Sequence, residues 1–360
     1  MKFNKVILAL AAVLVILVLM AGFATIFSGN GDFVQQSFKE KENVSMAVTG
    51  DVMFARNMPN VLSLESSPFA GVSNVTSNVD LLLINFENAA TNSGDAVKGD
   101  VPLKCSPDYV PLAKANNRTI ASLANNHAFD YGITGMEDTL SNLKDAGITP
   151  IGAGESEDEA HQAVTQEING RKITVLNYMD SNNFAEYSYD VMPYANGSTP
   201  GYSAYDSDDA QKQIAENNDS DLIVAYMHFG NEYSNSPNED QTRIAHELID
   251  YGADVVLGSH PHVPQGIEMY NGKPIFYSLG NFIFDQSNEA THVAYFVKIN
   301  LVNDTAQCSV YPIYISNYLP QFMGSEEGTS LLSGLSPQCS EMTIDDNGVG
   351  RLQFNLTEVK

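Results

Sequence analysis

Segments with the hydrophobic pattern of β-strands recur along the chain, and polar side chains follow many of them directly. Residues 44–52 show strand-like alternation that breaks at Gly50, which presents Asp51 at the carboxyl end of a strand. Residues 80–87 form a continuous apolar run that ends at Glu87, as expected for a strand buried on both faces. The same pattern predicts further strands at 119–124 (before Asn125, Asn126 and His127), 172–178, 221–227 (before His228) and 254–258 (before Ser259 and His260).

Helical patterns separate several of these strands. Residues 135–146 and 241–251 have helical periodicity, and each segment is closed by a glycine, Gly147 and Gly252. Strands that alternate with helices indicate an α/β fold with a largely parallel sheet. Ligand sites in such sheets lie beyond the carboxyl ends of the strands, where the polar residues named above are expected.

The pattern changes after His262. Residues 274–279, 294–301 and 309–314 are strand-like without intervening helices, which predicts an antiparallel layer that completes the same domain. Residues 181–209 are rich in Tyr, Asn, Ser and Gly and are expected to form a long surface loop.

The N-terminus predicts a membrane anchor. Lys2 and Lys5 precede an apolar run of about 22 residues, and about 20 residues are needed to cross a bilayer as a helix. A cleaved signal usually has a shorter apolar stretch, although the small residues Ala21, Gly22 and Ala24 leave cleavage open. We therefore expect a single-pass protein of the cell membrane whose domain faces the exterior. The expected organisation is a transmembrane signal anchor at 1–28, a tether at 29–43, a domain at 44–320 and a C-terminal extension at 321–360 that packs on the domain.

The charge of the chain narrows the range of partners. The 360 residues carry a formal net charge of −26, from 44 acidic and 18 basic residues. Such a surface repels nucleic acid and anionic lipid head groups, although acidity alone also suits a well-solvated surface in a salty medium. An acidic polymer would also be repelled at low salt, so its binding requires a local basic patch or screening by salt.

The three cysteines do not have the spacing of a metal site. Cys308 and Cys339 are near one another in sequence, and an oxidising exterior would permit a disulfide between them, which the sequence leaves open. Cys105 is then unpaired and is expected to be a buried thiol in the core.

The strand-end residues share one kind of chemistry. A single Asp or His at a strand end is usually a helix cap or a satisfied polar residue, but here successive strand ends all offer oxygen or imidazole ligands. Such mixed ligands suit zinc, manganese or iron, and a carboxylate such as Glu87 can bridge two cations. We therefore predict a site for one or two divalent metal ions, with these ligands: Asp51, Glu87, Asn126, His228, His260 and His262.

Six motifs in sequence order resemble the CapA (PgsA) capsule-synthesis family, which is related to the calcineurin-like metallophosphoesterases. They are GDVMFAR at 50–56, NFEN at 85–88, LANNHAFDYG at 123–132, MHFGNEY at 227–233, GSHPHV at 258–263 and YSLGNFIF at 277–284. The resemblance spans 44–320 and implies a four-layer αββα sandwich. It also implies a role in the synthesis or export of a poly-γ-glutamate type capsule polymer, within a polymer-synthesis complex.

The resemblance assigns a role to each motif residue. Asp51 matches the first metal-ligand aspartate and Glu87 the bridging carboxylate. Asn126, His228, His260 and His262 match further ligands, and His127 matches the histidine that protonates the leaving group. One position departs from the metallophosphoesterase pattern: Met53 stands where an imidazole ligand is usual. A thioether sulfur is a poor ligand for hard cations. One of the two metal positions therefore loses a ligand.

Four further residues have two interpretations each. Arg56 pairs either with a substrate phosphate or carboxylate or with an acidic residue of the domain. Asp130 either holds the His127 ring or caps the following helix. Glu232 is either an orienting partner of a ligand histidine or a solvated loop acid. Asn281 either lines the pocket or forms a turn with Gly280.

Three hypotheses of function follow. The first is a membrane-anchored capsule protein with a metal-dependent hydrolase-like site. The second is an exported metallophosphoesterase that acts on a small or lipid-linked phosphate ester. The third is a non-catalytic binding protein that retains a metal.

Overall fold

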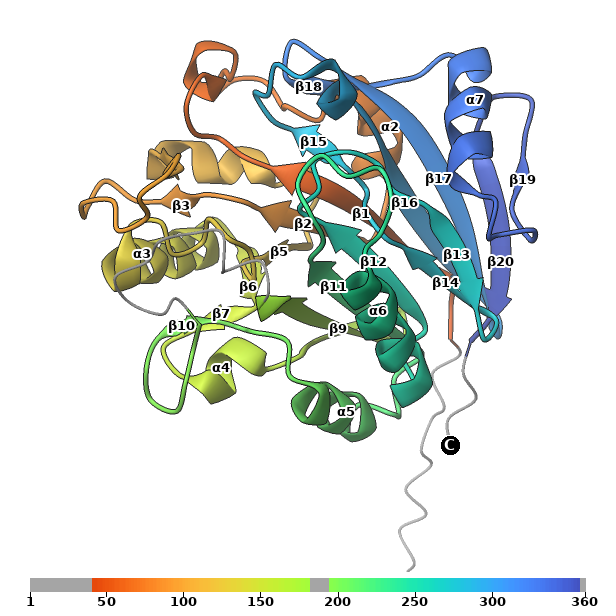
Figure 1. Cartoon of the computed structure of the whole chain (residues 1–360), viewed down its shortest axis with the longest axis horizontal. Helices are drawn as coiled ribbons and strands as arrows, with labels where there is room; N and C mark the ends of the chain where they lie inside the picture. The colour runs from red at the N-terminus through yellow and green to blue at the C-terminus, as the bar shows by residue number, and fades with distance from the viewer. Residues whose placement is uncertain (1–40, 182–193, 357–360) are drawn as a thin grey trace, which may run out of the picture. The chain divides into compact units, whose positions relative to one another are not determined.

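The predicted strands pair into two large β-sheets that share a hydrophobic core (Figure 1). The computed structural model describes residues 41–181 and 194–356. The predicted anchor at 1–28 and residues 29–40 of the predicted tether lie outside the described residues. Within the described ranges, no helix has both the length and the apolar character that crossing a membrane requires.

The first sheet has the order β19-β20-β17-β16-β1-β2-β5-β6, with β15 paired to β1 and β18 to β17. Strands β1, β2, β5 and β6 are parallel, whereas β16, β17 and β20 extend the sheet in antiparallel fashion. The bounds are β1 (Val44–Val52), β2 (Leu81–Phe86), β5 (Thr119–Ser122), β6 (Ile148–Ile151), β15 (Asn281–Ile283), β16 (Val293–Val302), β17 (Thr305–Ser316), β18 (Leu319–Phe322), β19 (Thr343–Ile344) and β20 (Gly350–Asn355).

The second sheet has the order β13-β14-β12-β11-β9-β8, and its four central strands, β14, β12, β11 and β9, are parallel. The bounds are β8 (Val164–Ile168), β9 (Arg171–Met179), β11 (Leu222–His228), β12 (Val255–Ser259), β13 (Ile267–Tyr270) and β14 (Lys273–Phe276). Two short pairs complete the strands: β3 (Ala89–Ala90) with β4 (Lys104–Cys105), and β7 (Ala153–Gly154) with β10 (Gly201–Tyr202).

Alternation along the central strands separates two cores. In β2, Leu83 points into the core between the sheets, whereas its neighbours Leu82 and Ile84 point into the core on the other face of the first sheet. All six residues of β2 are buried, which explains its uninterrupted apolar sequence. The strand pattern therefore already encodes a sheet that is covered on both sides.

Helices cover the outer faces, so the layers run helix, sheet, sheet, helix (Figure 1). Helix α3 lies against the first sheet, and α5 and α6 pack on the second sheet. Asn238 and Gln241 form a capping box at the start of α6, and Gly252 ends it at a φ of 117°, a conformation that favours glycine. The helices are α2 (Ser73–Thr76), α3 (Gly132–Asp145), α4 (Glu157–His161), α5 (Ser207–Glu216), α6 (Glu239–Tyr251) and α7 (Ser325–Leu335), with 3-10 turns at Met58–Asn60, Ala70–Val72, Pro107–Ala113 and Glu289–His292.

Two expectations need correction. The strand predicted at 274–279 lies in the second sheet, parallel to β12 and antiparallel to β13, whereas the strands near 294–301 and 309–314 extend the first sheet in antiparallel fashion. The predicted loop at 181–209 contains β10 and the start of α5, and its residues 182–193 lie outside the described part. Helix α5 escapes detection because Ala210 and Ile214 are its only buried residues, which is a weak periodic signal.

Candidate metal centre

The carboxyl ends of strands from both sheets meet at one buried site. Asp51 lies in β1, and Glu87 follows β2 directly. His228 ends β11 in the second sheet. The structure places the remaining predicted ligands beside them after β5 and β12, and every predicted ligand is buried: Asp51, Glu87, Asn126, His228, His260 and His262.

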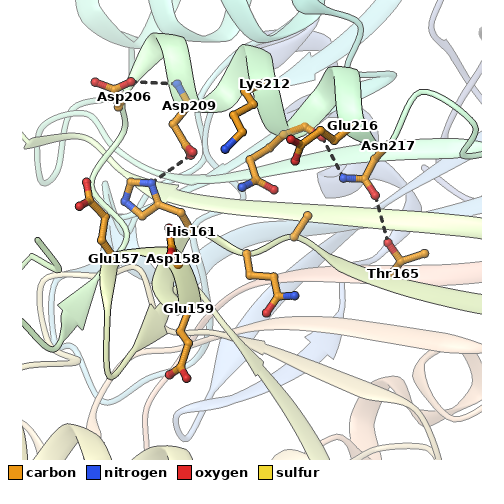
Figure 2. Close-up of a pocket in the computed structure, with 13 residues that line it drawn as sticks. Glu157, Asp158, Glu159, His161, Thr165, Asp206, Asp209, Lys212, Glu216 and Asn217 are labelled. Atoms are coloured by element: carbon orange, nitrogen blue, oxygen red, sulfur yellow. Dashed lines mark hydrogen bonds and ion pairs between the residues drawn. The ribbon is translucent and has the colours of Figure 1, made fainter. Parts of the chain in front are cut away.

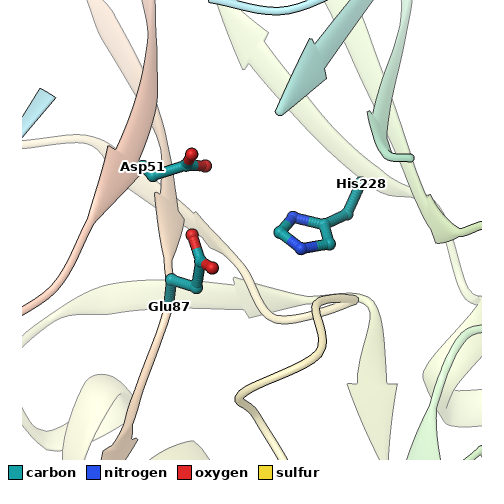
Figure 3. Close-up of side chains that lie close together, drawn as sticks. All are labelled: Asp51, Glu87 and His228. Atoms are coloured by element: carbon teal, nitrogen blue, oxygen red, sulfur yellow. The ribbon is translucent and has the colours of Figure 1, made fainter. Parts of the chain in front are cut away.

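Asp51, Glu87 and His228 form the centre of this cluster (Figure 3). Each offers one ligand atom, and these atoms lie within 4.8 Å of one another. The two carboxylates point toward the imidazole ring (Figure 3). The Asn85 amide donates to Asp51 Oδ1 at 2.8 Å and to Glu87 Oε2 at 3.1 Å, which fixes both carboxylates. Glu87 Oε1 has no hydrogen-bond partner among the described residues.

A second group of ligands surrounds His228. Its Nε2 lies 3.0 Å from Asn126 Oδ1, and its Nδ1 lies 3.0 Å from the Ser259 hydroxyl. The His260 ring is 4.7 Å from the His228 ring, centroid to centroid. His260 Nδ1 is buried and, within the described part of the chain, makes no hydrogen bond. His260 Nδ1 and Glu87 Oε1 are thus both buried without a hydrogen-bond partner among the described residues, a costly arrangement that a bound cation would satisfy.

His262 occupies the other side of the cluster. Its Nδ1 lies 3.0 Å from Asp51 Oδ2 and 2.9 Å from Asn281 Oδ1. Its Nε2 lies 3.8 Å from Glu87 Oε1, so the Glu87 carboxylate stands between the His228 and His262 groups.

Burial sets the protonation of these ligands. Burial, and next the charge of Asp51, raises the pKa of Glu87 well above its ordinary value. Burial lowers the pKa of His228 and brings that of His260 to about 3, so both rings are neutral at pH 7 and keep a lone pair for a metal. The donor set of carboxylates, imidazoles and an amide oxygen fits a divalent transition metal such as Mn, Zn or Fe.

Strained backbone surrounds the site. His260 has a φ of 99° and His262 a φ of 60°, and Arg56, Val101 and Tyr233 also have positive φ values of 51°, 44° and 62°. Residues other than glycine rarely adopt this conformation, and β-branched valine least readily. Such strain persists only where the surroundings impose it, and it concentrates at functional sites.

A pocket of about 280 Å³ lies beside the cluster. Four of the strained residues line it: Arg56, Val101, Tyr233 and His262. The predicted residues His127 and Glu232 also line it, as does Lys98. One predicted ligand, His262, therefore borders a cavity with room for a small group of a substrate.

The structure gives His127 two charged neighbours. Asp130 Oδ2 lies 2.6 Å from His127 Nδ1, so Asp130 holds the ring, and no side chain caps the start of α3. Lys98 Nζ lies 3.3 Å from the same nitrogen, donates to the Asn126 carbonyl at 3.2 Å and is 3.7 Å from Asp130 Oδ1. Burial lowers the pKa of both Lys98 and His127. Sequence reasoning missed Lys98 because a single lysine in a polar segment carries no motif.

Arg56 and Met53 both make their polar contacts within the domain. Arg56 donates through Nε and Nη2 to Asp285 Oδ1 and lies over the Phe284 ring, so it is paired within the domain at the pocket wall. Met53 is fully buried in the core around α3, and its sulfur accepts a hydrogen bond from the Ala55 amide at 2.8 Å.

A larger cavity, of about 970 Å³, lies between α4 and α5, and none of the predicted metal ligands lines it (Figure 2). Acidic side chains dominate its wall, and His161 Nδ1 lies 3.0 Å from Asp209 there (Figure 2). It lacks the convergence of buried donors and strained backbone found at the strand ends, so size alone does not make it the better candidate.

The three cysteines, Cys105, Cys308 and Cys339, are free and buried thiols. The Cys308–Cys339 disulfide that the sequence leaves open is therefore not formed in the structure.

Comparison with known proteins identifies relatives of this chain. The family described as "Bacterial capsule synthesis protein PGA_cap" matches residues 45–286. The PGA biosynthesis protein CapA of Bacillus subtilis is 34% identical over 318 residues, which is 86% of this chain and 81% of the relative. The capsule biosynthesis protein CapA of Bacillus anthracis is 32% identical over 295 residues, 79% of this chain and 70% of that protein.

Solved structures are more distant. The calcineurin-like phosphoesterase YfkN of Bacillus subtilis aligns with a TM-score of 0.40 at 12% identity, over 78% of this chain and 88% of that one. A likeness of this size carries no argument about the present site.

Proposed function

Because the chain belongs to the bacterial capsule synthesis protein family PGA_cap, we propose that it acts in the synthesis or export of an acidic surface polymer of the poly-γ-glutamate type, through a divalent-metal-dependent, hydrolase-like site. The observation that carries the metal-dependent part is the convergence of six buried ligands around orphaned atoms of Glu87 and His260. Asp51, Glu87 and His262 would hold one cation, and Glu87, Asn126, His228 and His260 a second.

The bound cations would supply Lewis-acid activation of a water and of a phosphoryl or acyl oxygen. Side chains of the protein would supply the proton transfer and line the substrate pocket. Asp130 fixes the His127 ring at Nδ1, and we infer that His127 Nε2 takes a proton from the attacking water and passes it to the leaving group. Lys98 and Arg56 line the same pocket, but each is paired with an aspartate, and Asp100 and Glu232 line the pocket too. The attraction for an anionic substrate would therefore come from the bound cations.

We place this domain on the outer face of the cell membrane, held by the apolar N-terminal segment and working beside the enzymes that make the polymer. The apolar run at 6–27 after two lysines supports this proposal. Protease added to intact cells should digest the domain, and digestion only after lysis would contradict the placement.

The proposed role is tested in a capsule-forming bacterium that lacks its own family member. The wild-type chain should restore the surface polymer, and His228→Ala should not, at equal protein level. Restoration by His228→Ala to the wild-type amount would contradict a metal-dependent role.

A second candidate is a metallophosphoesterase that acts on a small or lipid-linked phosphate ester. The volume of about 280 Å³ favours a small group, and the bound cations would attract an anionic one. Phosphomonoester and phosphodiester substrates, assayed with Mn, Zn and Fe, separate the candidates. Absence of turnover with a stoichiometrically bound metal would refute the phosphoesterase and would favour the third candidate, a binding protein that retains the metal.

A further inference from the structure

Met53 leaves one metal position with fewer ligands than the other. If Glu87 bridges, the position of His228 would have Glu87, Asn126, His228 and His260. The other would have Glu87, His262 and Asp51, whose Oδ2 lies 3.0 Å from His262 Nδ1. Met53 does not compensate, because its sulfur is turned to the Ala55 amide and its side chain lies in the hydrophobic core.

Asn281 lies where the missing ligand is needed. Its Oδ1 is 2.9 Å from His262 Nδ1, which in turn is 3.0 Å from Asp51 Oδ2. One imidazole nitrogen thus has two acceptor oxygens within 3.0 Å, although its single proton can serve only one of them well. The same pairing of an imidazole nitrogen with an asparagine oxygen, at 3.0 Å, occurs on the other side between His228 and Asn126.

The orientation of the Asn281 amide is fixed from behind. Its Nδ2 donates to Gln286 Oε1 at 2.9 Å and to the Thr291 carbonyl at 3.2 Å. Both amide protons have acceptors there, so the carbonyl oxygen must face His262 and Asp51. The side chain is buried, which leaves solvent little part in this choice.

The backbone explains why Asn281 is beside Asp51. Strand β15 pairs in parallel with β1, with Asp51 opposite Asn281, and the Asp51 amide donates to the Gly280 carbonyl at 3.2 Å. A Cβ at Gly50 would lie 1.8 Å from the Gly280 oxygen, so only glycine permits this approach. Two strands are therefore pressed together at the point where their side chains meet the site.

We propose that Asn281 Oδ1 is a direct metal ligand that replaces the imidazole lost at Met53 and completes a four-ligand position with Asp51, Glu87 and His262. The inference rests on the proposed metal site. It gives each position four protein ligands, one of them an asparagine oxygen, and it predicts two bound ions rather than one.

The test measures metal equivalents and affinities of the purified full-length chain after chelation and titration with Mn²⁺. Wild type should bind two ions, and Asn281→Ala should bind one, with the second weakened more than about 100-fold. Loss of an outer orienting neighbour costs about 10–100-fold, so this threshold separates a ligand from a residue that only positions His262. Asn281→Asp keeps a ligand oxygen and should retain both ions. Gln286→Ala, which removes only an outer partner of the amide, should retain both ions with a weakening of no more than about 10–100-fold.

Each other outcome has a definite meaning. Two ions of wild-type affinity in Asn281→Ala would overturn the inference and leave the proposed function intact. One ion in both wild type and Asn281→Ala would do the same. No bound ion in folded wild type would overturn the inference together with the metal-dependent function. An anomalous-scattering map of Zn-loaded crystals gives a second readout: an ion-to-Oδ1 distance of about 2.0–2.2 Å supports ligation, and one beyond about 3 Å refutes it.

Discussion

Lys98 is the buried cation of the site, and its replacement by methionine tests the electrostatics most sharply. Methionine retains the aliphatic stem and removes the charge. Lys98 Nζ lies 3.7 Å from Asp130 Oδ1, which gives a gross Coulomb attraction of about 4.5 kcal/mol at an effective dielectric constant of 20. Part of this is offset by the cost of burying the ammonium group, which is visible as the lowered pKa of Lys98.

Removal of one partner of a buried pair leaves the other charge uncompensated and costs about 3–5 kcal/mol. We therefore expect Lys98→Met to lower the free energy of unfolding of the metal-free chain by about 3–5 kcal/mol in a urea titration. The matched control is Lys172→Met, which breaks the exposed pair with Asp219 and should cost less than about 1 kcal/mol. In a double-mutant cycle, Asp130→Asn should recover at least about 1 kcal/mol of the Lys98→Met loss. Equal losses for Lys98→Met and Lys172→Met would refute the assignment of Lys98 as a structural charge of the site.

Three further predictions concern other parts of the molecule. In urea unfolding, Gly50→Ala should destabilise the domain by about 3 kcal/mol or more, because its Cβ would lie 1.8 Å from the Gly280 oxygen. The control Gly334→Ala, in α7 with open space around it, should be neutral or stabilising by up to about 1 kcal/mol. A thiol reagent should label none of the three buried cysteines before unfolding and all three afterwards, because burial raises their pKa values and brings that of Cys105 to about 12. Fewer than three labelled thiols after unfolding would reveal a disulfide. Mn²⁺ affinity should fall as the pH falls below the raised pKa of Glu87, because the ion must then displace a proton from the carboxylate. Calorimetry in buffers of different ionisation enthalpy should show proton release, and a Mn²⁺ affinity independent of pH would contradict the prediction.

Much of the fold could be predicted from the chain because its strands are simple in pattern. The segment at 44–52 coincides with β1, and the apolar run at 80–87 contains β2, since strands buried on both faces need uninterrupted apolar residues. Polar helix α5 could not be found, because only Ala210 and Ile214 face the core. The placement of 274–279 beside β12 also depends on tertiary pairing that local patterns do not record.

The residues of the candidate site were also predictable only in part. Residues at strand ends, such as Asp51 and His228, could be found because parallel strands bring their carboxyl ends together. Lys98 could not, because it reaches His127 from a segment without regular pattern. The orientation of the Asn281 amide is set by Gln286 and Thr291, and this is visible only once the chain is folded.

The central claim is that the strand ends form a metal site, and calorimetric titration of Mn²⁺ tests it most directly. Three proteins are compared: wild type, His228→Ala, and His246→Ala as a control that removes a histidine of α6, paired with Glu268 and outside the cluster of Asp51, Glu87 and His228. We predict stoichiometric binding by wild type and His246→Ala and the loss of at least one ion from folded His228→Ala. Equal binding by all three proteins, or none by wild type, would contradict the account.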